Sequence, residues 1–88
     1  MQVRNNSSDP VNWEQSGSGP APQGVAAAQQ GGQLQSGTSS GDFNPVGEAP
    51  YSVKFTNVNK PSQTADSGKF DNPSATVTLN DDWTVTVS

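Results

Sequence analysis

The chain has 88 residues, of which only 28% are hydrophobic, and its formal net charge is −4 at pH 7. This length leaves room for one small domain, and the low apolar content predicts a thin core. The absence of cysteine excludes disulfides and Cys-ligated metal sites, and the absence of histidine removes the commonest general base. Because four scattered cations are too few to bind a phosphate backbone or an anionic lipid surface, we expect neither nucleic acid nor a membrane as a partner.

No run of residues reaches the roughly 18–20 apolar residues of a membrane span. The start of the chain is polar where a signal peptide would carry an apolar stretch. We therefore expect a soluble protein, and the sequence leaves open whether a signal peptide has been removed.

Composition divides the chain into residues 1–15, 16–50 and 51–88. In the first part, a β-hairpin that pairs Val3 with Val11 and Met1 with Trp13 would place four apolar side chains on one face. We expect this hairpin, packed on the rest of the protein, with its turn at residues 5–9. The alternative is a single short strand from Val11 to Glu14.

Residues 16–50 are of low complexity, rich in Gly, Ala, Ser and Gln. Their only large apolar side chains are Val25, Leu34, Phe43 and Val46. So little apolar surface cannot offset the roughly 1–2 kcal/mol of backbone entropy lost for each ordered residue. We expect an extended or flexible segment that a partner holds in place.

Residues 51–88 alternate between apolar and polar side chains, which is typical of strands with one buried face. The pattern predicts strands over 51–56, 75–79 and 83–88. A three-residue loop at Asn80–Asp82 would pair Leu79 with Trp83 and place every apolar residue of the last two strands on one face. Such a loop needs a left-handed residue, and we expect Asn80 or Asp82 in that role.

The polar stretch between Thr56 and Ser74 is predicted to be a long loop, in which Val58 and Phe70 are the only large apolar anchors. We expect an all-β fold: a small antiparallel sandwich or partly open barrel of about five short strands, with a long extended insertion. The residues predicted for its centre are Trp13, Tyr51, Val53, Phe55, Phe70, Val77, Leu79, Trp83 and Val85.

The sequence offers little for catalysis or metal binding. Its one adjacent carboxylate pair, Asp81–Asp82, falls in a predicted exposed turn where successive side chains point apart. Asp66, Ser67 and Asp71 carry oxygen ligands suited to calcium but lack the spacing of a known calcium loop, and turn formation explains them better. We predict no catalytic residue, no metal and no cofactor, and hence a protein that is not an enzyme.

These features favour a structural or accessory subunit of a larger assembly, such as a decoration or cement protein of a virion or phage. Its partners would be the protein subunits of that assembly, reached through the extended segment, and a homo-oligomer is left open. A virion or extracellular location is then favoured over the cytoplasm. The predicted partner-binding residues are Val25, Leu34, Phe43, Val46, Trp13 and Trp83. The alternative is a small secreted or surface module that binds glycans through an exposed tryptophan.

Overall fold

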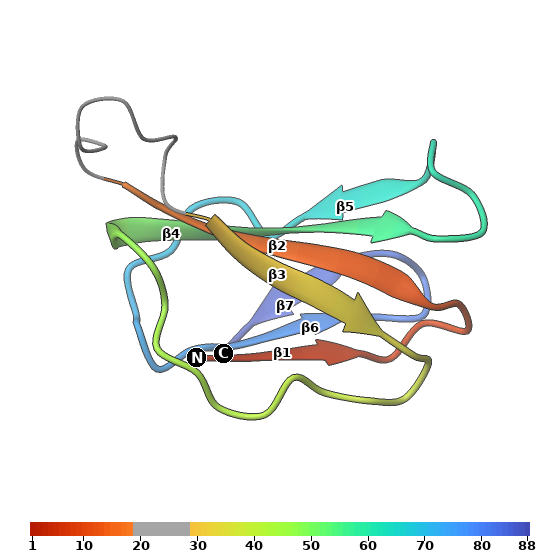
Figure 1. Ribbon diagram of the computed structural model, residues 1–88, viewed down its shortest axis with the longest axis horizontal. Coiled ribbons are helices and arrows are strands. Elements are labelled where there is room, and N and C mark those ends of the chain that lie inside the picture. The colour runs from red at the N-terminus through yellow and green to blue at the C-terminus, as the bar shows by residue number, and fades with distance from the viewer. Residues whose placement is uncertain (19–28) are drawn as a thin grey trace.

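Two stacked β-sheets make up the computed structural model, which describes residues 1–18 and 29–88 (Figure 1). The three-stranded sheet has the order β1 (Gln2–Asn5), β6 (Thr76–Leu79) and β7 (Val85–Val87). The four-stranded sheet has the order β3 (Gln29–Leu34), β2 (Val11–Ser18), β4 (Glu48–Asn57) and β5 (Thr64–Asp66).

The predicted all-β class is confirmed: the described strands form two separate sheets, of three and four strands, and do not close into a barrel. It has more strands than the five expected, and it is not purely antiparallel, since β1 pairs with β6 in parallel. No helix among the described residues has the length and apolar character needed to span a bilayer.

The core lies between the two sheets and follows the alternation read from the sequence. Of the predicted central residues, five are buried: Tyr51, Val53, Phe55, Val77 and Leu79. The other four, Trp13, Phe70, Trp83 and Val85, are half-buried and pack around them. Met1, Val3, Val11 and Leu34 complete the buried cluster. The core therefore draws on all three parts of the chain.

The predicted N-terminal hairpin is wrong. Val3 lies opposite Val77 in β1–β6, whereas Val11 lies opposite Leu34 and Asn57 in the other sheet. Both valines face the core, but they reach it from opposite sheets. Alternation shows that a side chain is buried without showing which sheet carries it, so the pattern could not separate the two arrangements.

The C-terminal hairpin has the predicted loop length, but its position differs by one residue. Leu79 pairs with Val85, and the loop is Asp81–Trp83, closed by a hydrogen bond from the Asn80 N–H to the Thr84 carbonyl (2.8 Å). The residue in the left-handed region is Trp83, with φ of 63°, instead of Asn80 or Asp82. The shift preserves the side-chain parity, so the apolar residues still share one face.

The long loop predicted between Thr56 and Ser74 contains a strand. β5 pairs with β4 in antiparallel fashion, with Ala65 opposite Phe55. Further along, Phe70 and Tyr51 exchange backbone hydrogen bonds of 2.9 and 2.7 Å, and their rings lie 6.1 Å apart. Phe70 therefore anchors this segment, as its isolation in a polar stretch suggested.

A long insertion at residues 16–50 is not confirmed, because the described parts of this segment belong to the sandwich. Its residues form the end of β2, all of β3 and the start of β4. Between β3 and β4, the chain runs along the outer edge of β1, where the Ser40 and Phe43 N–H groups donate to the Val3 and Met1 carbonyls at 2.8 Å. Figure 1 shows this connection, in yellow-green, beside β1.

Gly31 in β3 allows an unusually close approach of two strands. A Cβ at this position would collide with the backbone carbonyl oxygen of Trp13, whereas a Cβ at Gly32 would lie an ordinary 3.5 Å from the Trp13 Nε1. The two adjacent glycines therefore differ: only the first is required by the packing of β3 on β2.

We predict that Gly31→Ala lowers the free energy of unfolding by about 1–3 kcal/mol, because the added methyl must push β3 away from β2. The matched control, Gly32→Ala, should change it by less than about 0.5 kcal/mol. Urea unfolding followed by tryptophan fluorescence measures both. Equal effects of the two substitutions would contradict the close packing at Gly31.

Candidate functional site

The edges of the two sheets differ in length and protection. The described connection between β3 and β4 covers the edge of β1. The edge strands β5 and β7 have three residues each, whereas β3 has six. Strand β3 contains no charged residue and no proline, the two residue types that commonly protect a free edge. It is therefore the longest edge of the described sheets and carries neither protection.

The residues of β4 divide into those whose backbone groups bond to β5 and those whose backbone groups bond to β2. The Tyr51 N–H donates to the Phe70 carbonyl, and the Asn57 N–H donates to the Gln63 carbonyl (3.0 Å), so the odd-numbered residues of β4 bond toward β5. Bonding direction alternates along an antiparallel strand. The even-numbered residues of β4 therefore bond toward β2.

The same alternation continues across β2 to the free edge. The residues of β2 opposite the even-numbered residues of β4 are Asn12, Glu14 and Ser16, so the odd-numbered residues of β2 bond toward β3. Their partners are Leu34, Gly32 and Gln30. The backbone N–H and C=O groups of the remaining β3 residues, Gln29, Gly31 and Gln33, consequently point away from the sheet.

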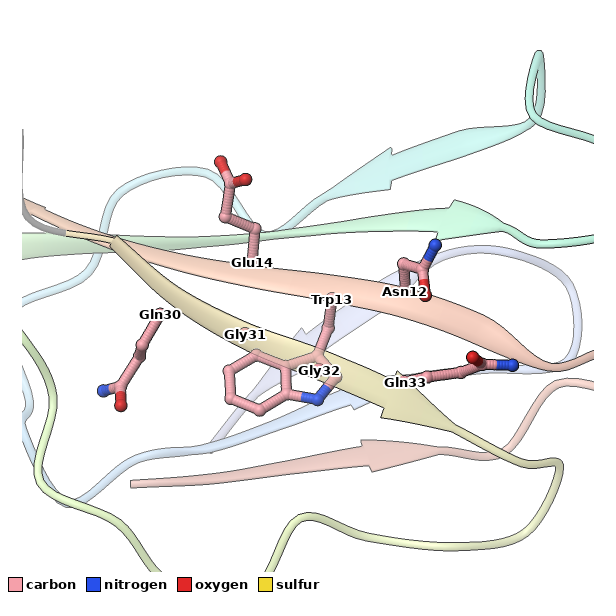
Figure 2. Close-up of a pocket in the computed structure, with 7 residues that line it drawn as sticks. All are labelled: Asn12, Trp13, Glu14, Gln30, Gly31, Gly32 and Gln33. Carbon is pink, nitrogen blue, oxygen red and sulfur yellow. The ribbon is translucent and has the colours of Figure 1, made fainter. Parts of the chain in front are cut away.

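A shallow hollow lies at this edge, where two consecutive glycines leave the strand without side chains. It is lined by Asn12, Trp13, Glu14, Gln30, Gly31, Gly32 and Gln33. Figure 2 shows that Asn12 and Glu14 point to one side of the sheet, while Trp13 and Gln30 point to the other. The hollow therefore presents amide, carboxylate and indole groups around bare backbone.

Trp13 is half-buried beneath Gly32, and its indole ring stacks on Phe43 with 5.2 Å between ring centroids. Its Nε1 atom lies beside Gly32, and no described residue accepts a hydrogen bond from it. Phe43 covers part of one face of the ring. This geometry leaves little room for a sugar ring to stack.

The structure brings only some of the predicted partner-binding residues together. Trp13 and Phe43 are in contact, and Val46 is half-buried beside Gln15. Leu34 is buried in the core, so its side chain is not available to a partner. Trp83 is half-buried in the C-terminal hairpin loop. Val25 lies outside the described residues.

Two buried amides that hold this region in place were not singled out from the sequence. The Gln15 Oε1 accepts from the Val46 N–H (2.8 Å) and from the Gln30 Nε2 (2.9 Å), and the Gln15 Nε2 donates to the Val46 carbonyl (3.2 Å). The Asn5 Nδ2 donates to the Leu34 carbonyl at 3.1 Å. The available signal was the inward position of Gln15, which follows Val11 and Trp13 in the alternation of β2.

The outer face of the four-stranded sheet is polar and carries a row of alternating charges. Lys54 lies opposite Glu14 on one side and Asp66 on the other. Opposite charges on directly facing residues favour this register modestly. Within residues 1–18 and 29–88, no group of three or more acidic residues is placed to hold a metal ion.

Asp82 is the acidic group with a distinctive local environment. Its Oδ1 accepts from the Thr84 hydroxyl (2.6 Å) and from the Thr84 N–H (3.2 Å). These hydrogen bonds lower the pKa of the Asp82 carboxyl below its ordinary value. Their position at the left-handed Trp83 shows a structural role in the hairpin loop.

Comparisons with protein-family models, with curated protein sequences and with solved structures found no match.

We predict that Gln15→Ala lowers the free energy of unfolding by about 1–3 kcal/mol, because the Val46 N–H then loses its acceptor in a partly buried position. Gln33→Ala, an exposed change of the same type, is the control and should stay within about 0.5 kcal/mol of the wild type. Chemical denaturation measures both. A negligible effect at Gln15 would show that its amide does not hold residues 44–46.

The lowered pKa of Asp82 predicts how the stability of the protein depends on pH. Because its folded pKa is lowered, its ionised form adds stability that is present above the unfolded pKa and is lost as the pH falls through the folded one. The stability difference between the wild type and Asp82→Asn should therefore be constant near neutral pH and shrink below about pH 4. Thermal unfolding from neutral to acidic pH measures this difference. A difference that grows on acidification would contradict the role of Thr84.

Proposed function

We propose that this chain is a non-enzymatic structural or accessory subunit that joins other protein subunits in a larger assembly, as a decoration or cement protein of a virion does. The observation that carries the proposal is the outer edge of β3, which pairs with no other described strand, is six residues long and has no charged residue or proline. A rigid sandwich with such an edge is suited to adding a strand from another protein, since backbone hydrogen bonds provide the contact.

The contact proposed here differs from the one that the sequence suggested. The sequence favoured the extended segment as the arm that reaches neighbouring subunits. Its residues 35–47 instead connect two strands and run along β1, and Leu34 is in the core. Among the described residues of that segment, β3 is the part whose outward backbone groups pair with no other strand, so a neighbouring chain can use them.

The buried polar side chains support a structural role. They are Asn5, Ser7, Gln15 and Asn57. Asn5 donates to the carbonyls of Asp9 and Leu34, and Gln15 bonds to both backbone groups of Val46. These amides and this hydroxyl hold turns and connections against the sheets. They are not acid–base groups poised beside a cleft.

A glycan-binding module is the second candidate, favoured by one observation. The Nε1 edge of the Trp13 ring lies beside Gly32, on the same side of the sheet as the Gln30 side chain, at the hollow at Gly31–Gly32. An amide on the same side as an indole is compatible with sugar recognition. The stacking of Phe43 on the ring makes this candidate weaker than the first, because sugars usually need an open aromatic face.

We expect the full-length chain to enter a complex much heavier than 9.1 kDa when it is expressed, with an affinity tag, in its native source. Gradient sedimentation followed by mass spectrometry of the purified complex measures its size and protein composition. Gln33→Pro should release the chain to the light fractions, because proline removes the outward N–H of β3. Gln33→Thr keeps that N–H and is the matched control.

Two results would overturn the proposal. One is a chain that sediments at its own mass in the native extract. The other is a purified chain that binds an oligosaccharide with a shift of the Trp13 indole N–H signal in NMR spectra, lost in Trp13→Phe and unaffected by Gln33→Pro. The second result would establish the glycan-binding alternative instead.

A further inference from the structure

We propose that the occupant of the β3 edge is β3 of a second copy of this chain, paired antiparallel about a two-fold axis. The inference rests on the proposed function and names the partner of that edge. The two four-stranded sheets would then join into one continuous sheet. The inference is based on the match between the symmetry of such a pair and the outward-pointing backbone groups of β3.

Symmetry restricts how two copies of β3 can pair. Antiparallel strands related by a two-fold axis have that axis perpendicular to the sheet, so both sheets keep the same face on the same side. Directly opposed residues must then point to the same face, which requires both to be odd-numbered or both even-numbered. This condition holds for any dimer that continues the sheet.

The outward backbone groups of β3 determine which of the opposed pairs can form hydrogen bonds. The outward groups belong to the odd-numbered residues, Gln29, Gly31 and Gln33, since the even-numbered residues bond to β2. A register centred on Gly31 pairs residues 29–33 of the two copies, with Gly31 opposite Gly31 and residue 29 opposite Gln33. These odd-numbered pairs can each exchange both of their hydrogen bonds, whereas Gln30 and Gly32 face each other between them as a non-hydrogen-bonded pair.

Gly31, the residue at the symmetry axis, is also compatible with such a pair. Gly31 has no side chain, so no side chain stands at the centre of the pair. The strand carries no charge, so pairing places no like charges directly opposite each other, although each chain carries a net charge of −4. Glu14, which lies opposite Gly31, belongs to the next strand inward.

The other described edges are less suited to self-pairing. Residues 37–43 already bond to β1. β5 ends in Asp66 and has three residues, and β7 also has three. Two strands of six residues bury little side-chain area, so the dimer should be weak and reversible, with a dissociation constant between about 10 µM and 1 mM. Weak contacts of this kind become effective when an assembly holds many copies.

Sedimentation velocity on the purified full-length chain tests the inference between about 10 µM and 1 mM. The average mass of the wild type and of Gln33→Thr should rise toward twice the monomer value. Gln33→Pro and Gln33→Lys should raise the dissociation constant at least about tenfold, the first by removing the outward N–H and the second by adding an edge charge. The lysine variant retains the backbone of β3, so it keeps the test valid if the proline variant misfolds.

Amide hydrogen exchange measured by NMR supplies the residue-level test. As the concentration rises, the Gly31 and Gln33 amides should become protected. The Gly32 amide bonds to β2 in the monomer and should not change, which makes it an internal control. Protection at Gly31 and Gln33 that is lost in Gln33→Lys would support the pairing proposed here.

Several results would overturn it. A mass that stays monomeric up to about 1 mM, or a dimer that survives both edge-blocking variants, excludes pairing through β3. If a different protein protects the Gly31 and Gln33 amides while the isolated chain stays monomeric, self-pairing is wrong and the proposed function stands. If the chain neither dimerises nor enters any complex in its native source, both proposals fail.

Discussion

The backbone pairing of residues 37–43 with β1 is the interaction on which the rest of the structure depends. β1 contributes Val3 to the core and bonds to β6 on one side, so its other side would otherwise be an open edge. The N–H groups of Ser40 and Phe43 close that edge by donating to Val3 and Met1. Phe43, held in this way, stacks on Trp13 of the opposite sheet and links the two layers.

Buried amide side chains also hold the parts of the chain that come before and after residues 37–43. Asn5 ties the end of β1 to the end of β3, and Gln15 ties β2 to residues 44–46. A polar segment with few apolar side chains can therefore be ordered because its backbone groups find partners in the sandwich. The entropy argument from composition omitted these hydrogen bonds, which are contributed by residues distant in the sequence.

Alternation was enough to predict the strands that carry large apolar side chains. It identified the buried residues of β4 and β6, and parity kept the C-terminal hairpin on the correct face although its loop lies one residue further along. It could not identify β3, whose Gly31 and Gly32 have no side chains to alternate. Nor could it identify the parallel pairing of β1 with β6, because Val3 is equally buried in either sheet. For the candidate site, Trp13 was recognised, whereas the free backbone beside it becomes visible only once the strand order is known.

One part of the polar segment protects an edge, while another forms an edge that is left open. This contrast underlies the proposed role in assembly, and it requires residues 37–43 to be ordered in the isolated chain. Hydrogen exchange of the Ser40 and Phe43 amides in dilute monomer is the most direct measurement. The account predicts protection approaching that of the core amides of Val53 and Phe55. Exchange at the rate of an unfolded peptide would contradict it and restore the flexible arm that the composition suggested.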